Sequence, residues 1–128
     1  MLSSKQRKLM NKILVVDDDA DILNSVSWIL RKNDFEVVTL IDCRKVLETV
    51  RDTKPDLILL DINLGYCDGR QLCLQLKNTN LFNHPILLFS ANPEMVESVS
   101  LYKADDFIQK PFAIKEFVTT IREHLLLN

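Results

Sequence analysis

The chain has 128 residues, of which 47% are hydrophobic and 27% are charged, as in one soluble globular domain. This composition excludes disordered and fibrous proteins. The longest apolar runs, such as Ile13–Val16, contain four residues, whereas a membrane-spanning helix needs about 20. Acidic residues follow the first of these runs directly, so the basic N-terminus does not lead into a signal-peptide core. We therefore expect a cytoplasmic protein with no membrane partner.

The charge of the chain is unevenly distributed. The net charge is −2, but four basic residues and no acidic residue lie among the first twelve, so the remainder carries 12 basic and 18 acidic residues, a net charge of −6. Phosphate contacts with basic side chains supply most of the affinity of proteins for nucleic acids. We therefore expect no nucleic-acid binding by the folded part, and divide the chain into a basic arm, residues 1–10, and a domain, residues 11–128.

The cysteines and glycines exclude several kinds of site. Cys43, Cys67 and Cys73 form no CxxC pair and have no histidine at metal-ligand spacing, so we expect reduced thiols, with a redox or zinc role as the alternative. Gly65 and Gly69 are the only glycines of the sequence. Walker and Rossmann phosphate-binding loops need more glycines than this.

Short apolar runs alternate with segments of helical spacing along the whole chain. Runs typical of buried strands are Ile13–Asp17, Glu36–Leu40, Asp56–Asp61, Ile86–Ser90 and Asp106–Gln109. The intervening segments place apolar residues three or four positions apart, as on one face of a helix, and Trp28 is expected to be core or half-buried. Five such repeats predict an α/β fold of the flavodoxin-like (βα)5 type. Its doubly wound, five-stranded parallel sheet has strand order 2-1-3-4-5 and helices on both faces.

Reactive side chains follow four of the predicted strands. Asp17 and Asp18 end the first, Asp61 the third, Ser90 the fourth and Lys110 the fifth. In an open parallel sheet the carboxyl ends of these strands share one cleft. Three carboxylates there would repel one another unless a cation lay between them, and oxygen ligands favour Mg²⁺ first and Mn²⁺ second. With a lysine and a hydroxyl group, this is the composition of a phosphoryl-transfer site.

Each of these residues also has an ordinary structural explanation. An acid at a strand end commonly caps a helix, which applies to Asp19 and Asp21, while Ser90 could cap the fourth helix and Lys110 could be a solvated charge. Such roles explain each residue singly, but they do not explain why residues of this kind end four neighbouring strands. We therefore take the group as a functional site.

Four segments give the sequence a specific resemblance to a known family. They are KILVVDDDADI, KPDLILLDINLGYCDG, HPILLFSA and ADDFIQKPF, in this order. With them the chain resembles the receiver domain of two-component response regulators over residues 11 to 126. The resemblance implies a signalling switch that accepts a phosphoryl group from a histidine kinase or a histidine phosphotransfer protein. It implies no separate enzyme activity, although the domain would assist its own phosphorylation and dephosphorylation.

The resemblance assigns the acidic residues specific roles. Asp61 matches the phospho-acceptor, whose carboxylate forms an acyl phosphate. Asp18, Asp61 and the backbone carbonyl of Asn63 are implied as direct Mg²⁺ ligands, with Asp17 bound through water. Asn63 and Asn92 occupy positions that tune the lifetime of the phosphorylated state in the family.

The resemblance also assigns the switch residues. Ser90 matches the hydroxyl that contacts the phosphoryl group, and Ala91 keeps the neighbouring space small. Lys110 matches the phosphate-pairing lysine, and the bond to Pro111 is expected to be cis. Phe107 occupies the switch-aromatic position but lacks the hydroxyl of the commoner tyrosine. These residues would remodel the face of the fourth helix, fifth strand and fifth helix for a downstream protein, an output domain or a second copy of the chain.

The sequence departs from the family pattern at two points. Leu64-Gly65-Tyr66 replaces a common Met-Pro-Gly stretch, which predicts a more mobile loop beside Asp61. Lys103 replaces a glycine that usually ends the fourth helix, so that turn is expected to be strained or to take another geometry.

Two further hypotheses concern the kind of protein. A haloacid-dehalogenase-like phosphatase also has acids after an apolar strand and would use Asp17 as its nucleophile, but no Gly-Thr follows these acids here. A phosphorylation-independent binding module on the same fold would have a broken acid cluster. Because the receiver fold would use about residues 11 to 126, we expect a free-standing switch, a phosphorelay carrier or the excised receiver of a larger regulator.

Overall fold

The fold is described by a computed structural model over residues 10–126, so the basic residues of the arm before residue 10 lie outside the described part. Five parallel strands form one sheet in the order β2-β1-β3-β4-β5, as predicted. The strands are β1 (Lys12–Val16), β2 (Glu36–Leu40), β3 (Leu57–Asp61), β4 (Ile86–Ser90) and β5 (Asp106–Gln109). Three strands have the predicted bounds. β1 begins and ends one residue earlier than predicted, and β3 begins one residue later.

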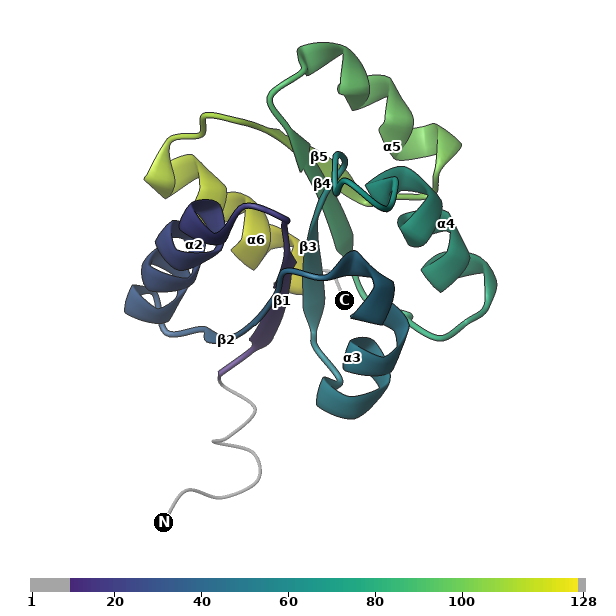
Figure 1. Cartoon of the computed structure of the whole chain (residues 1–128). Coiled ribbons are helices and arrows are strands. Elements are labelled where there is room, and N and C mark those ends of the chain that lie inside the picture. The colour runs from purple at the N-terminus through teal and green to yellow at the C-terminus, as the bar shows by residue number, and fades with distance from the viewer. Residues whose placement is uncertain (1–9, 127–128) are drawn as a thin grey trace.

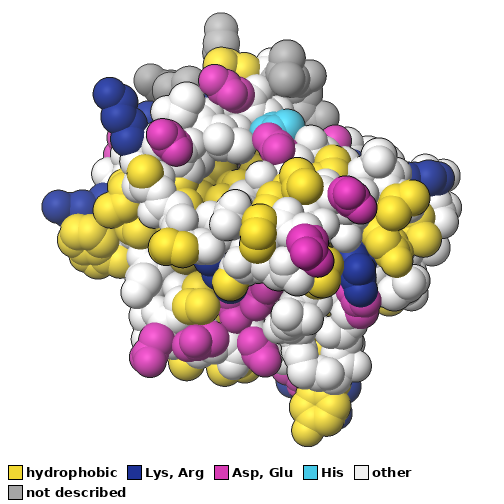
Figure 2. All heavy atoms as spheres, turned by 90° about the horizontal axis from the view of Figure 1, so that it is seen from above, with side chains coloured by type: hydrophobic (Ala, Val, Ile, Leu, Met, Phe, Trp, Pro, Cys, Tyr) yellow, Lys and Arg dark blue, Asp and Glu magenta, His cyan; other side chains and the backbone are white. Residues whose placement is uncertain are grey.

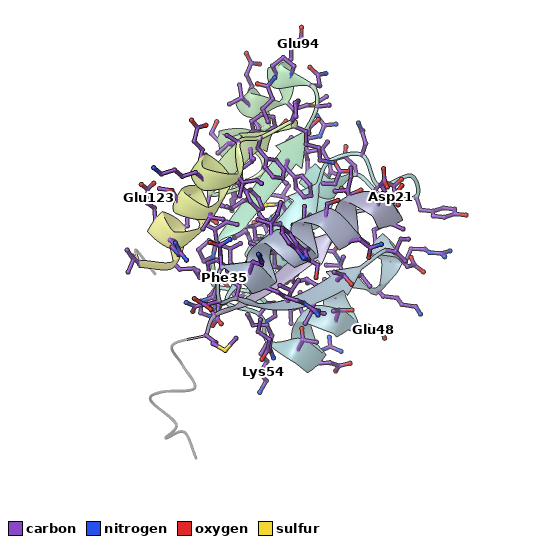
Figure 3. All side chains as sticks on the ribbon, turned by 90° about the vertical axis from the view of Figure 1, so that its left-hand side faces the viewer. Asp21, Phe35, Glu48, Lys54, Glu94 and Glu123 are labelled. Atoms are coloured by element: carbon purple, nitrogen blue, oxygen red, sulfur yellow. A yellow bond between two sulfur atoms is a disulfide. The ribbon has the colours of Figure 1, made fainter. Side chains whose placement is uncertain are left out.

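Helices cover both faces of this sheet (Figure 1). α2 and α6 lie on one face, and α3, α4 and α5 lie on the other. The bounds are α2 (Ala20–Lys32), α3 (Val46–Thr53), α4 (Gly69–Asn78), α5 (Ser98–Leu101) and α6 (Ile114–Leu126), with 3₁₀ turns η1 (Cys43–Lys45) and η2 (Pro93–Glu97). Figure 3 views the face of α2 and α6 and marks the first turn of α2 at Asp21. Within residues 10–126, none of the helices combines the length and apolar character needed to cross a membrane.

The sheet separates two hydrophobic cores, because successive side chains of a strand point to opposite faces. In β1, Ile13 and Val15 belong to the core beneath α2 and α6. Leu14 and Val16 belong to the core beneath α3 and α4. All four side chains are fully buried, which explains why this strand is continuously apolar. Burial on both faces holds the carboxyl ends of β1, β3 and β4 in fixed positions.

Side-chain caps start the helices that follow these strand ends. Asp19 precedes α2, and its carboxylate accepts hydrogen bonds from the backbone N–H groups of Asp21 and Ile22. The structural explanation of Asp19 as a helix cap is therefore confirmed. Asn92 caps η2 in the same way, by accepting from the N–H of Glu94. These caps satisfy N–H groups that the first helical turn leaves unpaired.

The expectation of three reduced thiols is wrong for two of the cysteines. Cys43 and Cys67 form a disulfide, with their Cα atoms 6.3 Å apart. They are 24 residues apart in sequence, but β2 and β3 both pair with β1, so the loops that leave their carboxyl ends meet above it. Cys73 is a free and buried thiol, and burial raises its pKa to about 12.

Trp28 and Lys103 are unusual in different ways, Trp28 in its exposure and Lys103 in its backbone conformation. Trp28 was expected to be core or half-buried, but it is 61% exposed, and the ammonium group of Lys32 lies 4.9 Å from its ring centroid. The buried stripe of α2 runs instead through Leu23, Val26 and Leu30. Lys103 has a φ of +59°, so of the two outcomes expected from the missing glycine, a strained turn or another geometry, the structure shows the strained turn.

Candidate functional site

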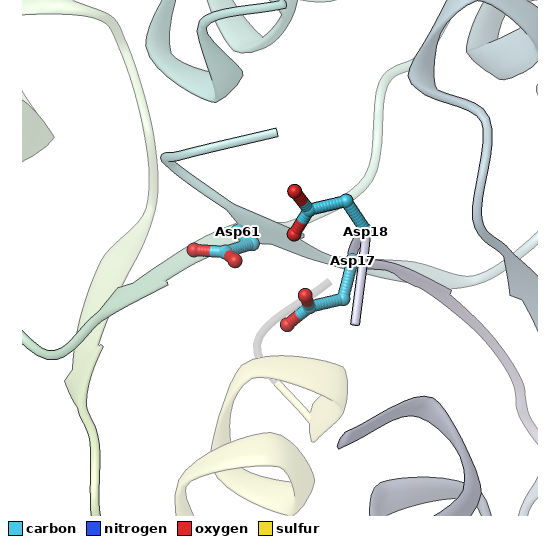
Figure 4. A group of neighbouring side chains, drawn as sticks. All are labelled: Asp17, Asp18 and Asp61. Atoms are coloured by element: carbon cyan, nitrogen blue, oxygen red, sulfur yellow. The ribbon is translucent and has the colours of Figure 1, made fainter. Parts of the chain in front are cut away.

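The three predicted acids lie together at the carboxyl end of the sheet. Asp17 and Asp18 directly follow β1, and Asp61 is the last residue of the neighbouring strand β3. Each offers a carboxylate oxygen, and these oxygens lie within 4.8 Å of one another (Figure 4). Viewed from above in Figure 2, acidic side chains gather on this face of the molecule. The alternation of strands and helices therefore brings together residues that are far apart in sequence.

The three acids differ in their exposure and in their partners. Asp17 is completely buried, Asp61 is buried, and Asp18 is exposed. The Nζ atom of Lys110 donates to Asp17 Oδ2 at 3.0 Å and to Asp61 Oδ2 at 3.3 Å. Asp17 Oδ1 also accepts the backbone N–H of Asp19 at 3.0 Å. Asp17 is therefore held from two sides, whereas Asp18 faces the open side of the cluster.

Asp61 has an unusual protonation equilibrium. Burial raises its pKa to about 6, and the nearby charge of Asp17 acts in the same direction, while Lys110 opposes them. One lysine thus compensates the acids only in part. Any further positive charge at the site would therefore favour the ionised form of Asp61.

The donor set fits a hard divalent cation. It consists of carboxylate oxygens, which Mg²⁺ and Mn²⁺ prefer, and contains no histidine or cysteine. Asn63, the fourth predicted ligand, lies two residues beyond Asp61, and its N–H approaches Asp61 Oδ1 at 3.4 Å. The backbone of Asn63 thus borders the cluster at Asp61.

The predicted switch residues occupy the two strands beyond Asp61. Ser90, at the end of β4, is buried, and its hydroxyl oxygen accepts the N–H of Asn92 at 3.1 Å. The exposed Ala91 follows it and borders a pocket together with Lys110. The peptide bond between Lys110 and Pro111 is cis, as expected. Phe107 in β5 is half-buried and packs against the core beneath α3 and α4.

The loop between β3 and α4, together with the first residue of α4, lies close to Asp61. A Cβ atom at Gly69 would collide with the carbonyl oxygen of Asp61, so glycine is needed for this close approach. Gly65 has a φ of +74°, a conformation that glycine adopts readily. Leu64 is buried in the core beneath α3 and α4. Although the proline of the family pattern is missing, the loop is held by Leu64 and by the disulfide at Cys67.

Sequence reasoning did not identify the role of Arg70. The guanidinium group of Arg70 pairs with Asp68, the N-cap of α4, at 2.7 Å. It also contacts the sulfur of Met95 at 3.7 Å and lies 5.3 Å from the ring centroid of Tyr102. Arg70 therefore links the start of α4 to η2 and the end of α5. The N-cap Asp68 had a sequence signal in the Asp-Gly pair, but the contacts with residues 95 and 102 had none.

The family of the chain follows from comparison with known proteins. Residues 13–122 match the model of the response regulator receiver domain. The chain belongs to the response regulator receiver domain family. The match includes every predicted site residue and agrees with the sheet order, the acid cluster and the lysine described above. It does not support the alternative of a haloacid-dehalogenase-like phosphatase.

Individual relatives give the same assignment. The DNA-binding response regulator MtrA of Mycobacterium tuberculosis is 35% identical over 122 residues, which are 94% of this chain and 53% of MtrA. The alkaline phosphatase synthesis transcriptional regulatory protein PhoP of Bacillus subtilis is 37% identical over 82% of this chain and 44% of PhoP. This chain therefore spans about half the length of the curated relatives that it matches.

Solved receiver structures have the same fold. The BeF3-activated N-terminal receiver domain of Klebsiella pneumoniae RstA superposes with a TM-score of 0.84 at 31% identity, over 90% of this chain and 98% of that domain. The chemotaxis protein CheY4 of Vibrio cholerae superposes with a TM-score of 0.81 at 26% identity, over 90% and 98% of the two chains.

Proposed function

We propose that this domain accepts a phosphoryl group on Asp61 from a phosphohistidine of a sensor histidine kinase or a histidine phosphotransfer protein. The observation that carries the proposal is the placement of Asp61 between two further carboxylates and the ammonium group of Lys110. This placement provides a nucleophile, a cation site and a fixed positive charge in one small volume. Family membership supports the same assignment.

The transfer requires an ionised Asp61. One carboxylate oxygen of Asp61 attacks the phosphorus atom, a new O–P bond forms, and the P–N bond to the donor histidine breaks. The electron pair of that bond returns to the imidazole ring, which takes up a proton. Because the pKa of Asp61 is about 6 without a metal ion, most of the residue is ionised and nucleophilic at neutral pH.

The acid cluster is proposed to hold Mg²⁺, with Mn²⁺ as the second choice. Asp18, Asp61 and the backbone carbonyl of Asn63 would be direct ligands, and Asp17 would bind through water. When bound, the ion neutralises negative charge on the reacting oxygens. The exposure of Asp18 leaves this side of the cluster accessible to an ion and to the donor.

The remaining site residues receive and retain the phosphoryl group. Lys110 already pairs with Asp61 and would pair with a phosphoryl oxygen after transfer. The hydroxyl of Ser90 accepts a bond from Asn92, which leaves its own proton free to donate to the phosphoryl group. The small side chain of Ala91 leaves room for that group. Asn63 and Asn92 flank this space and would set the rate of its hydrolysis.

The switch is proposed to act through Phe107. Movement of Ser90 toward the phosphoryl group would shift the segment after β4, and the half-buried ring of Phe107 would follow inward. This change would remodel the face formed by α5, β5 and α6. The output would then be a downstream protein, a further domain such as those of the longer relatives, or a second copy of this domain. The domain would assist both the transfer from its donor and the later hydrolysis of the acyl phosphate with its own side chains.

The division of the chain and its location complete the proposal. We assign residues 11–128 to the receiver domain and residues 1–10 to a basic arm. We propose a cytoplasmic location, where a kinase would draw the phosphoryl group from ATP. The acidic body of the domain disfavours contact with nucleic acid, so protein partners are expected.

The test uses a small phosphodonor in place of the unknown kinase. Intact mass and peptide mapping after incubation with acetyl phosphate and Mg²⁺ should locate one phosphoryl group on Asp61. Asp61→Ala should take up none, and Asp52→Ala, which changes an exposed acid on α3, should react like the parent protein. Omission of Mg²⁺ should abolish the reaction. Phosphorylation of Asp61→Ala, or of Asp17 in the parent protein, would overturn the assignment.

A further inference from the structure

We propose that Cys43 and Cys67 form a reversible redox site that fixes the loop beside the phospho-acceptor and thereby strengthens cation binding. The link to cation binding rests on the proposed function of the acid cluster. The disulfide joins the turn η1, after β2, to the loop of residues 62–68, between β3 and α4. That loop carries Asn63, a proposed cation ligand, so the covalent link ties an element of the proposed site to the neighbouring turn η1.

The disulfide is coupled to the acid cluster through direct neighbours. The sulfur of Cys43 lies 3.8 Å from the carbonyl oxygen of Leu64, the residue that follows Asn63. A Cβ atom at Gly65 would lie 3.6 Å from Asp18 Oδ2, which shows how closely the loop approaches the exposed acid. Asp18, Cys43, Leu64 and Gly65 also line one pocket of about 300 Å³. Displacement of Cys67 would therefore change the wall of this pocket and the position of Asn63.

Apart from the disulfide, the tip of the loop is held by a ring contact and by hydrogen bonds within the loop, including one of 2.9 Å from the N–H of Tyr66 to the carbonyl of Leu64. Tyr66 is 83% exposed, and its ring contacts the guanidinium group of Arg44 at 4.5 Å. The N–H of Leu64 reaches the carbonyl of Cys67 at 3.3 Å, a long hydrogen bond. Without proline in this loop, the link to Cys43 is the strongest restraint on residues 65–67. Loss of that link would increase the number of loop conformations and would raise the entropy lost when the loop is ordered around a cation.

The two cysteines differ in accessibility in a way that suits stepwise oxidation. Cys67 is half-buried, whereas Cys43 is buried. Hydrogen peroxide would oxidise the Cys67 thiol to a sulfenic acid and release one water. The Cys43 thiol would then attack that sulfur and release a second water, so two thiols lose two electrons and two hydrogens. A dithiol reductant would reverse the reaction by thiol–disulfide exchange and become a disulfide itself.

The third cysteine provides an internal control. Cys73 lies on α4, is completely buried and has no disulfide partner. Its burial disfavours the thiolate form that reacts with oxidants and disulfides. In the reducing compartment proposed for this domain, stable disulfides are rare, and those found are usually transient and either catalytic or redox-sensing. A selective pair beside the phospho-acceptor fits that use better than a permanent structural role.

The first experiment measures the loop itself in the folded protein. Samples oxidised with hydrogen peroxide and samples reduced with a dithiol are checked by intact mass for the loss or gain of two hydrogen atoms. Amide hydrogen exchange of the peptide that covers residues 62–68 should be about tenfold slower in the oxidised form. Cys67→Ser, at the less buried position, should exchange like the reduced parent protein under both conditions. Cys73→Ala should keep the full redox response. Equal exchange in the two forms of the parent protein would overturn the proposal.

The second experiment tests the coupling to the acid cluster. Titration calorimetry with MgCl₂ should give about threefold tighter binding to the oxidised form, because its loop is already ordered. Cys67→Ser should bind Mg²⁺ with the affinity of the reduced form in either condition. Equal affinity of the two forms would overturn the coupling while Mg²⁺ binding itself stands. Absence of Mg²⁺ binding to both forms would overturn the proposed phosphoryl-transfer function and the coupling with it.

Discussion

The ammonium group of Lys110 lies 3.0 Å from Asp17 Oδ2 in a site where the two side chains are 16% and 1% exposed. The same group lies 3.3 Å from Asp61 Oδ2. A single cation from the end of β5 therefore compensates two acids that follow other strands. It is also the only basic side chain paired with these two acids in the described part of the chain.

Replacement of this lysine should strongly destabilise the metal-free protein. Lys110→Met leaves Asp17 and Asp61 without a paired cation, and a broken buried pair reduces the free energy of unfolding by about 3 kcal/mol. Urea denaturation in EDTA measures the change. Lys115→Met, at an exposed position of α6, should change stability by less than about 0.5 kcal/mol. Equal effects of the two variants would show that the ion pairs contribute nothing.

The raised pKa of Asp61 predicts a specific dependence of stability on pH. Its pKa is about 6 in the folded protein and 3.8 as the ordinary value, so the folded state binds the proton more tightly. This contribution to stability is full below pH 4 and is lost as pH rises through about 6. Asn cannot ionise, so Asp61→Asn lacks this pH dependence and, because it buries no charge, should be more stable than the parent protein at pH 7 by about 3 kcal/mol. Denaturation from pH 4 to 7 in EDTA tests this. Parallel pH profiles for the parent and variant would contradict it.

The close approach of α4 to β3 predicts a large effect at Gly69. A Cβ atom there collides with the carbonyl oxygen of Asp61, so Gly69→Ala should lower the free energy of unfolding by about 3 kcal/mol and slow phosphorylation. Gly65→Ala is the matched comparison, because it has room for a Cβ atom and only its φ of +74° is unfavourable. That variant should lose about 1 kcal/mol. Thermal unfolding ranks the two, and the reverse order would contradict the structure.

The strained turn at Lys103 predicts a stabilising substitution. Lys103 adopts a φ of +59°, which glycine reaches without the steric penalty of a side chain. Lys103→Gly should therefore raise the free energy of unfolding by about 0.5 kcal/mol after loss of the hydrogen bond to Asn78. Lys103→Ala loses the same bond but keeps the Cβ atom, and should be less stable than the glycine variant. If urea denaturation shows the glycine variant to be no more stable than the alanine variant, the positive φ of Lys103 does not destabilise the turn.

The fold and the main site residues could be predicted because local patterns determined them. Continuously apolar runs indicated strands buried on both faces, and parallel strands bring their carboxyl ends to one edge. Asp17, Asp61 and Lys110 each follow such a run directly. Their meeting was therefore a consequence of topology, and the ion pairs of Lys110 agree with it.

Features that depend on contacts between loops could not be predicted in the same way. Cys43 and Cys67 lie in loops after different strands, and no spacing rule relates such positions. Arg70 reaches Tyr102 across two elements, and long side chains leave no periodic signal. Trp28 was misjudged for another reason, because an aromatic residue beside an apolar stripe can lie outward beneath the ammonium group of a neighbouring lysine, here Lys32.

The alternation of β1 between the two cores also decides which of two adjacent aspartates is enclosed. Asp17 continues the series of Ile13 and Val15, and is completely buried against Lys110. Asp18, of identical chemistry, is exposed. The enclosed acid and the exposed acid thus differ because successive side chains of a strand point to opposite faces of the sheet. Deletion of one residue within β1, with the register of its first residues unchanged, would bring Asp18 to the enclosed position and move Asp17 into the strand, so the length of this strand is a determinant of the chemistry at its end.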